Sequence, residues 1–118
     1  MQFIDLKSRH QLIGDKISAR IQKVMEHGQF ILGPEVREVE EKLAQFTGSK
    51  HCVSVSSGTD SLLIALMALS VGLGDEVITV PYTWISTAEV IGLLGAKPVF
   101  VDIRTDTLNM DETLLEDA

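Results

Sequence analysis

The sequence is poor in cysteine, and this limits both its cross-linking and its cellular setting. Cys52 is the single cysteine, so no internal disulfide can form. It lies within His51 to Val55, a short run rich in β-branched residues that is typical of a buried strand. We therefore expect Cys52 to act as a small packing residue in a reducing cytoplasm.

Long apolar runs are also missing. The longest, Leu62 to Leu69, is far too short to cross a bilayer. The first residues, Met1 to Asp5, have neither the basic region nor the apolar run of a signal peptide. These features predict a soluble, cytoplasmic protein without a membrane partner.

Positive charge is scarce, with 10 lysines and arginines against 17 acidic residues and a net charge of −7. Nucleic acids and anionic membranes would repel such a protein, so we expect neither as a partner. The acidity is best interpreted as an aid to solubility, although a local group of N–H donors can still bind a small anion. The three histidines, His10, His27 and His51, are too scattered for metal ligands, so no metal site is expected.

The first 48 residues have a helical pattern. Apolar residues at helical spacing predict an amphipathic helix over residues 8–27 that ends at Gly28. Pro34 suits the first turn of a second helix, which Gly48 ends. The loop between them, Gln29 to Gly33, is apolar, which suggests that another part of the protein or a second chain covers it.

From residue 49 onward the pattern alternates between strands and helices, which predicts an α/β domain with a parallel sheet flanked by helices. Three such strands leave two exposed edges, so we expect 49–118 to be an incomplete domain of a longer protein. Asp111 is the expected N-cap of a further helix that begins around Leu114 and Leu115. The expected strands are His51–Val55, Glu76–Val80 and Pro98–Ile103, and the expected helices are Leu62–Ser70 and Ile85–Leu94.

A turn between the first strand and its helix could bind phosphate. In parallel α/β sheets, ligands bind beyond the carboxyl ends of the strands, where helix N-termini present free N–H groups. Gly58 allows close approach of the backbone, and the hydroxyls of Ser57 and Thr59 can donate. The alternative is a plain helix N-cap, because Ser, Thr and Asp are also the residues expected at a cap.

Trp84, the only tryptophan, follows the second expected strand and should lie at the same rim of the sheet. A flat side chain there could stack on a planar heterocycle, or it could pack against neighbouring helices. The phosphate turn and the aromatic on one rim indicate a cofactor site more strongly than either does alone.

Several spaced blocks together resemble the DegT/DnrJ/EryC1/StrS family of sugar aminotransferases. The blocks occur in the family's order and run almost from end to end of the chain. They are Phe3-Ile4-Asp5-Leu6, Gly28 to Val36, Ser57 to Leu62, Gly72 to Ile78, Pro81 to Ala88 and Gly95 to Ile103.

The resemblance implies a type I, aspartate-aminotransferase-like fold that binds pyridoxal 5′-phosphate (PLP), with residues 49–118 as part of its large domain. It implies that Gly58 and Thr59, with Ser57, hold the cofactor phosphate and that Trp84 stacks on the pyridine ring. It further implies a homodimer in which residues 1–48 pack on the large domain and at the dimer interface. Phe30 to Leu32 could then shape that interface or the mouth of the active site, or simply pack.

The resemblance also implies transfer of an amino group, commonly from glutamate, to a nucleotide-linked keto sugar. The Schiff-base lysine and the acidic partner of the pyridine nitrogen match no residue here, so no catalytic residue is assigned and the 118-residue chain alone should be inactive. Lys97 lies at the start of a strand, away from the rim, and is interpreted as solvated. The alternative function is a non-catalytic regulatory or partner-binding member of the same family.

Overall fold

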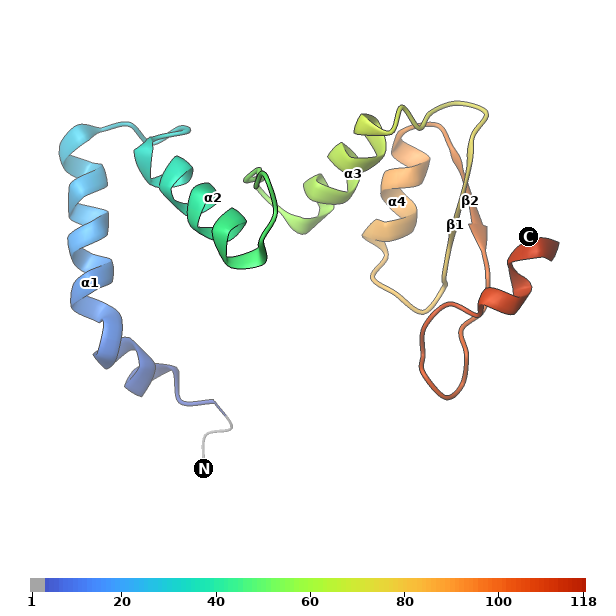
Figure 1. The fold of residues 1–118 in the computed structure, drawn as a ribbon, viewed down its shortest axis with the longest axis horizontal. Coiled ribbons are helices and arrows are strands. Elements are labelled where there is room, and N and C mark those ends of the chain that lie inside the picture. Colours follow the sequence, from blue (N-terminus) through green and yellow to red (C-terminus); the bar gives the residue numbers. More distant parts are fainter. Residues whose placement is uncertain (1–3) are drawn as a thin grey trace. The chain divides into compact units, whose positions relative to one another are not determined.

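A computed structural model describes residues 4–118, which form two compact units (Figure 1). The first unit ends at Ser54 and the second spans Val55–Ala118. Within the described residues, no helix is both long and apolar enough to cross a membrane. The first unit contains two helices, α1 (Leu6–His27) and α2 (Pro34–Thr47). The second unit contains, in chain order, α3 (Gly58–Ala68), β1 (Glu76–Thr79), α4 (Ser86–Leu93), β2 (Lys97–Phe100) and a 3₁₀ helix, η1 (Glu112–Asp117).

Both helices of the first unit end where the sequence indicates. The chain leaves α1 through Gly28, at φ +68°, and the N–H of Gly28 donates to the carbonyl of Val24 at 2.9 Å. Pro34 occupies the first turn of α2, and Gly48, at φ +72°, ends it. Left-handed backbone of this kind strains residues that carry a Cβ, so glycine is the natural terminator. The two expected helices and their ends are confirmed.

Ion pairs join α1 to α2. The Arg20 guanidinium binds both carboxylate oxygens of Glu38, at 2.5 and 2.7 Å, and the Lys42 ammonium reaches the same carboxylate at 2.6 Å. Hydrogen bonds from Arg20 and then Lys42 lower the pKa of Glu38 to about 2. These side chains are solvent-exposed, so the pairs contribute little to the stability of the fold.

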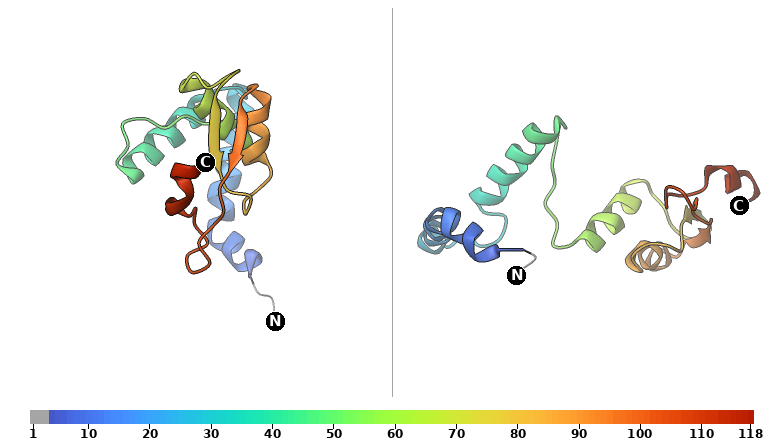
Figure 2. Two further views of the ribbon diagram at one scale, coloured as in Figure 1. Left: turned by 90° about the vertical axis from the view of Figure 1, so that its right-hand side faces the viewer. Right: turned by 90° about the horizontal axis from the view of Figure 1, so that it is seen from below.

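The second unit is built on a pair of parallel strands. β1 and β2 lie side by side, with Glu76 opposite Lys97 and Thr79 opposite Phe100 (Figure 2). Helix α4 connects them, as a parallel pair requires, and packs on both strands while α3 packs on α4. The core of this unit is small and consists of the apolar residues Val90, Ile91, Ala96 and Val101.

The expected first strand, His51–Val55, is wrong as secondary structure. A strand needs a neighbour for its backbone hydrogen bonds, and no part of residues 4–118 pairs with this segment. The N–H of Ser54 donates instead to the carboxylate of Glu40, at 2.7 Å. Cys52 is accordingly a half-buried free thiol outside any strand, and the sheet has two strands rather than three.

The carboxyl-terminal elements differ from expectation in length and type. The strand expected over Pro98–Ile103 covers Lys97–Phe100, after which Ile103 forms an isolated antiparallel bridge with Met110. Asp111 does act as an N-cap, because its carboxylate accepts the N–H of Thr113 at 3.0 Å. The helix that it begins is of the tighter 3₁₀ type, which is common in short pieces.

The loop between α1 and α2 is exposed in the chain. Phe30, Ile31 and Leu32 are 66%, 88% and 72% exposed, and Leu32 has a positive φ of +48°. A Cβ on Gly33 would clash with the carbonyl oxygen of Gln29, which explains the glycine at that position. The cover expected for this apolar loop is therefore not provided by its own unit.

Candidate functional site

Two loops lie at the same end of the second unit. The chain enters α3 through Ser57 and enters α4 through the segment 80–85, which follows β1. In Figure 1 the N-terminal ends of α3 and α4 lie toward the end of the unit at which both strands finish. The sequence-predicted phosphate turn and the segment that carries Trp84 thus share one rim, as parallel α/β topology demands.

The turn at the start of α3 combines a helix cap with free donors. Ser57 is the N-cap, since its hydroxyl oxygen accepts the N–H of Asp60 at 3.1 Å. The N–H groups of Gly58 and Thr59 have no acceptor among residues 4–118. A Cβ added to Gly58 would meet no atom within 4 Å, so the space beside its Cα is open. The cap and the anion-binding interpretations are therefore both compatible with one turn.

Asp60 organises the hydroxyl groups of this turn. Its carboxylate accepts hydrogen bonds from Ser56 and, at 2.9 Å, from Ser57. These bonds, that from Ser56 most of all, lower the pKa of Asp60. The Ser57 hydroxyl is thus already engaged as donor and acceptor, whereas the Thr59 hydroxyl makes no hydrogen bond among the described residues.

The sequence analysis did not identify the hydrogen bonds that join Ser56 and Asp60 in this turn. The signal was present in the spacing, because a serine N-cap followed three residues later by an acidic residue resembles a capping box. In this turn the Asp60 carboxylate bonds to serine hydroxyls.

Trp84 is 78% exposed at the same rim. Its carbonyl accepts the N–H of Thr87 at 3.1 Å, which ties the residue to the first turn of α4. The indole is not part of the small core of this unit. An exposed indole at the same rim as free helix amides is suited to cover a flat ligand.

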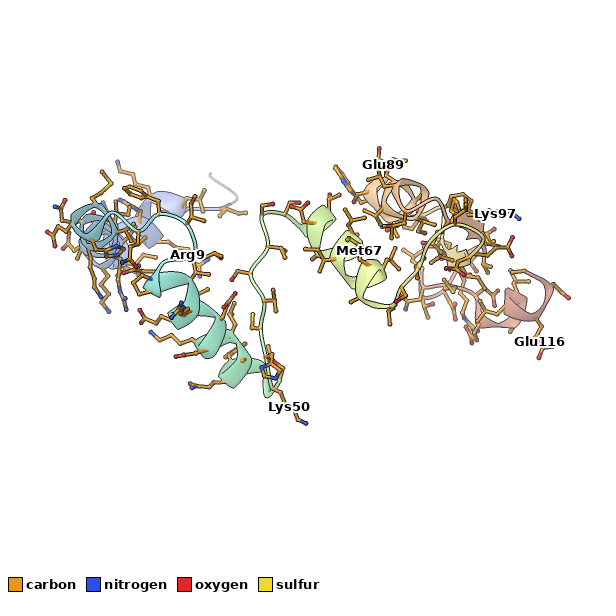
Figure 3. The ribbon with its side chains drawn as sticks, turned by 90° about the horizontal axis from the view of Figure 1, so that it is seen from above. Arg9, Lys50, Met67, Glu89, Lys97 and Glu116 are labelled. Atoms are coloured by element: carbon orange, nitrogen blue, oxygen red, sulfur yellow. The ribbon has the colours of Figure 1, made fainter. Side chains whose placement is uncertain are left out.

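Lys97 lies at the opposite end of the sheet. It is the first residue of β2, and its ammonium donates to the carboxylate of Glu76 at 2.7 Å (Figure 3). Both side chains are exposed, which agrees with the solvated role expected for Lys97. No cluster of metal-ligating side chains occurs within the described range 4–118.

The free donors of this turn are of the kind that bind an anion such as a phosphate group. Two unpartnered N–H groups and the Thr59 hydroxyl belong to a helix N-terminus, where the helix dipole favours an anion. The ionised Asp60 opposes an anion, but its charge is bonded to the two serine hydroxyls. Fold and rim together define a parallel α/β protein of the class that holds a phosphorylated planar cofactor.

Comparison with known proteins identifies the family within that class. The sequence model of the DegT/DnrJ/EryC1/StrS aminotransferase family matches residues 11–118. The chain belongs to this family. It is 58% identical, over all of its 118 residues, to the UDP-2-acetamido-2-deoxy-3-oxo-D-glucuronate aminotransferase of Pseudomonas aeruginosa, and it spans 33% of that relative's length.

Solved structures agree with this assignment. The chain resembles a DegT DnrJ EryC1 StrS aminotransferase from Brucella abortus, with a TM-score of 0.91 and 44% identity over 98% of the chain and 31% of that structure. It also resembles NtdA from Bacillus subtilis, which was solved with its bound cofactor PMP, with a TM-score of 0.84 and 31% identity over 88% of the chain and 24% of that structure. The likeness confirms the expected α/β fold of PLP-dependent aminotransferases.

Proposed function

We propose that this chain supplies the cofactor-phosphate grip of a PLP-dependent aminotransferase that acts on a nucleotide-linked keto sugar. The observation that carries the proposal is the pair of free N–H groups on Gly58 and Thr59, at the rim where Trp84 is exposed. When bound, PLP supplies an electron sink for reaction at the amino-bearing carbon. The residues of this chain hold and orient that group.

The phosphate end is held by backbone rather than by cationic side chains. The N–H groups of Gly58 and Thr59 donate to phosphate oxygens, and the Thr59 hydroxyl adds a third donor. Asp60 keeps the Ser57 hydroxyl in its capping position, so Ser57 acts mainly by fixing the start of α3. Such fixed donors need little rearrangement on binding, which favours affinity.

The ring end is held by Trp84. Its exposed indole can lie against the face of a pyridine ring and shield it from water. The carbonyl of Trp84 anchors it to Thr87, so the indole starts from a defined backbone position. Phosphate grip and indole together orient the cofactor, while the proton transfers fall to residues outside these 118.

The substrates follow from the family and from the P. aeruginosa relative. We propose glutamate as the amino donor and a nucleotide-linked keto sugar as the acceptor, in a cytoplasmic homodimer. The UDP-linked 3-oxo sugar acid in the name of that relative is the first acceptor to test. Residues 1–48 are proposed to pack on the large domain and at the dimer interface, where the exposed Phe30 to Leu32 would find cover.

A hybrid protein tests the proposal directly. In this hybrid, the present chain replaces the matching third of the P. aeruginosa aminotransferase. We expect the hybrid to bind PLP and to move an amino group from glutamate to the UDP-linked 3-oxo sugar. A folded hybrid that binds no PLP would show that this segment cannot supply the grip. A hybrid that binds PLP without transferring an amino group to any keto sugar would favour the non-catalytic alternative.

The 118-residue chain by itself provides a second test of the proposal. We expect this chain to bind PLP weakly. We also expect that borohydride reduction will not attach PLP to any single lysine, because no lysine here occupies the Schiff-base position of the family. Peptide mass mapping after reduction reports the modified residue. Stoichiometric labelling of one particular lysine, such as Lys97, would contradict the assignment of that chemistry to other residues.

A further inference from the structure

The apolar loop between α1 and α2 has a defined shape although its tip is exposed (Figure 1). Phe30, Ile31 and Leu32 form the tip, and Gly33, which follows it, is buried. Leu32 has a positive φ of +48°, a backbone conformation that is strained for a leucine. Such strain persists only where surrounding contacts hold the backbone in place, so the base of the loop should contain those contacts.

His27, the last residue of α1, contacts both ends of this loop. Its Nδ1 accepts the backbone N–H of Gln29 at 3.0 Å, where the loop begins. Its Nε2 lies 3.1 and 3.3 Å from the two carboxylate oxygens of Glu35, in the first turn of α2. The side chains of His27 and Glu35 are only 24% and 23% exposed. One imidazole ring therefore bridges the start of the loop and the helix that follows it.

These two contacts define the protonation state of the ring. A backbone N–H can only donate, so Nδ1 offers its lone pair and carries no proton. An ionised carboxylate can only accept, so the single proton of the neutral ring is on Nε2. An imidazolium has two donors and no acceptor. The bridge between Gln29 and Glu35 therefore requires a neutral His27.

Charged groups of both helices lie near the ring. Glu35 contacts it from α2, and the ammonium of Lys23, one turn back on α1, is 4.0 Å from the Glu35 carboxylate. Arg20 of α1 is paired with Glu38 of α2. Glu35 favours an additional proton on the ring and Lys23 opposes it, so these two charges offset one another in part. The backbone N–H at Nδ1 opposes that proton directly, because both would occupy the same lone pair.

We infer that His27 is a pH-sensitive switch for this loop: the neutral ring holds Phe30 to Leu32 in one position, and an additional proton from solvent, which Nδ1 must take, displaces the Gln29 N–H and releases the loop. The consequence for assembly rests on the proposed homodimer, in which this loop would contact the second copy. A fixed loop loses less conformational freedom on binding than a mobile one, so the neutral ring favours the dimer.

Amide hydrogen exchange in the hybrid protein tests the switch. We expect the Gln29 amide to exchange on the order of tenfold faster at about pH 5.5 than at about pH 7.5, a range in which histidine changes charge, after correction for the intrinsic effect of pH on exchange. Equal protection of Gln29 at both values would overturn the inference, as would rapid exchange at both.

Two substitutions separate the roles of the ring. In His27→Asn the side chain keeps an acceptor near the position of Nδ1 but cannot titrate, so Gln29 should stay protected at both pH values. In His27→Gln the longer side chain can reach Glu35 but carries its amide beyond the position of Nδ1, so protection should be lost at both. His10→Asn is the matched control on the same helix and should leave the pH response of Gln29 unchanged. A pH response that survives in His27→Asn would contradict the inference.

The oligomeric state of the hybrid reports the consequence for assembly. We expect acid to raise the dimer dissociation constant about fivefold more in the parent hybrid than in His27→Asn, as for the loss of one hydrogen bond. Analytical ultracentrifugation at the two pH values measures this constant. A hybrid that is monomeric throughout would contradict the proposed homodimer, and the exchange of Gln29 then decides the switch by itself. A dimer with the same acid response in both proteins would contradict the role of His27.

Discussion

At the start of α3, neighbouring residues divide two tasks that the sequence alone leaves merged. Ser57 caps the helix and is bound to Asp60, whereas Gly58 and Thr59 keep their amides free. The interpretation of this turn as a helix cap and its interpretation as a phosphate-binding turn are therefore compatible. The cap fixes the turn, and the amides next to it remain available for a ligand.

Substitution separates the two tasks. We expect Ser57→Ala to lower the free energy of unfolding by about 1 kcal/mol, the usual value of a serine N-cap. The pKa of Asp60 should rise toward its ordinary value, because a hydroxyl that lowers it is lost. Thr59→Val should leave the free energy of unfolding nearly unchanged and weaken PLP binding by the hybrid. Urea denaturation and PLP titration measure the two effects, and a reversal of the two variants would refute this division.

Trp84 should matter to the ligand and not to the fold. Because the indole is 78% exposed, we expect Trp84→Ala to change the free energy of unfolding by less than about 0.5 kcal/mol. Lost stacking of about 0.5–1.5 kcal/mol should weaken PLP binding by the hybrid roughly two- to tenfold. Trp84→Phe should restore most of the affinity. If alanine and phenylalanine bind PLP equally well, Trp84 does not stack.

Among the elements, the helices were predictable and the first strand was not. The stops at Gly28 and Gly48 are local signals, since each glycine adopts the left-handed backbone that ends a helix. A strand depends on a distant partner, and 51–55 has the composition of a strand without a neighbour in residues 4–118. The sequence pattern also did not predict that η1 is a 3₁₀ helix, because capping by Asp111 does not determine the type of helix that follows.

The pairing of α1 with α2 should respond to acid. Glu38 has a pKa of about 2 in the folded chain, below its ordinary value of 4.5. A lowered pKa contributes stability above pH 4.5, and this is lost as the pH falls toward 2. We expect Glu38→Gln to reduce the acid sensitivity of the first unit, measured by circular dichroism at low salt. Glu41→Gln is the control, as Glu41 forms no ion pair within the described residues. Equal pH profiles for both variants would contradict the pairing.

Across the whole molecule, the family was predictable because it depends on ordered sequence blocks. The network of Ser56 and Asp60 and the exposure of α3 were not, because they depend on which side chains meet in space. The chain spans about a third of the length of the P. aeruginosa relative, and its described residues form a sheet of two strands.

The affinity of the hybrid protein for PLP, compared between Gly58→Ala and Gly92→Ala, tests the central claim most directly. In neither case does the added Cβ meet an atom within 4 Å, so both variants should fold. We expect Gly92→Ala to bind PLP normally, and Gly58→Ala to bind roughly 10- to 100-fold more weakly because a methyl group blocks charge-assisted hydrogen bonds to the phosphate. Pyridoxal, which lacks the phosphate, should bind both alike. Unchanged PLP affinity in Gly58→Ala would contradict the account.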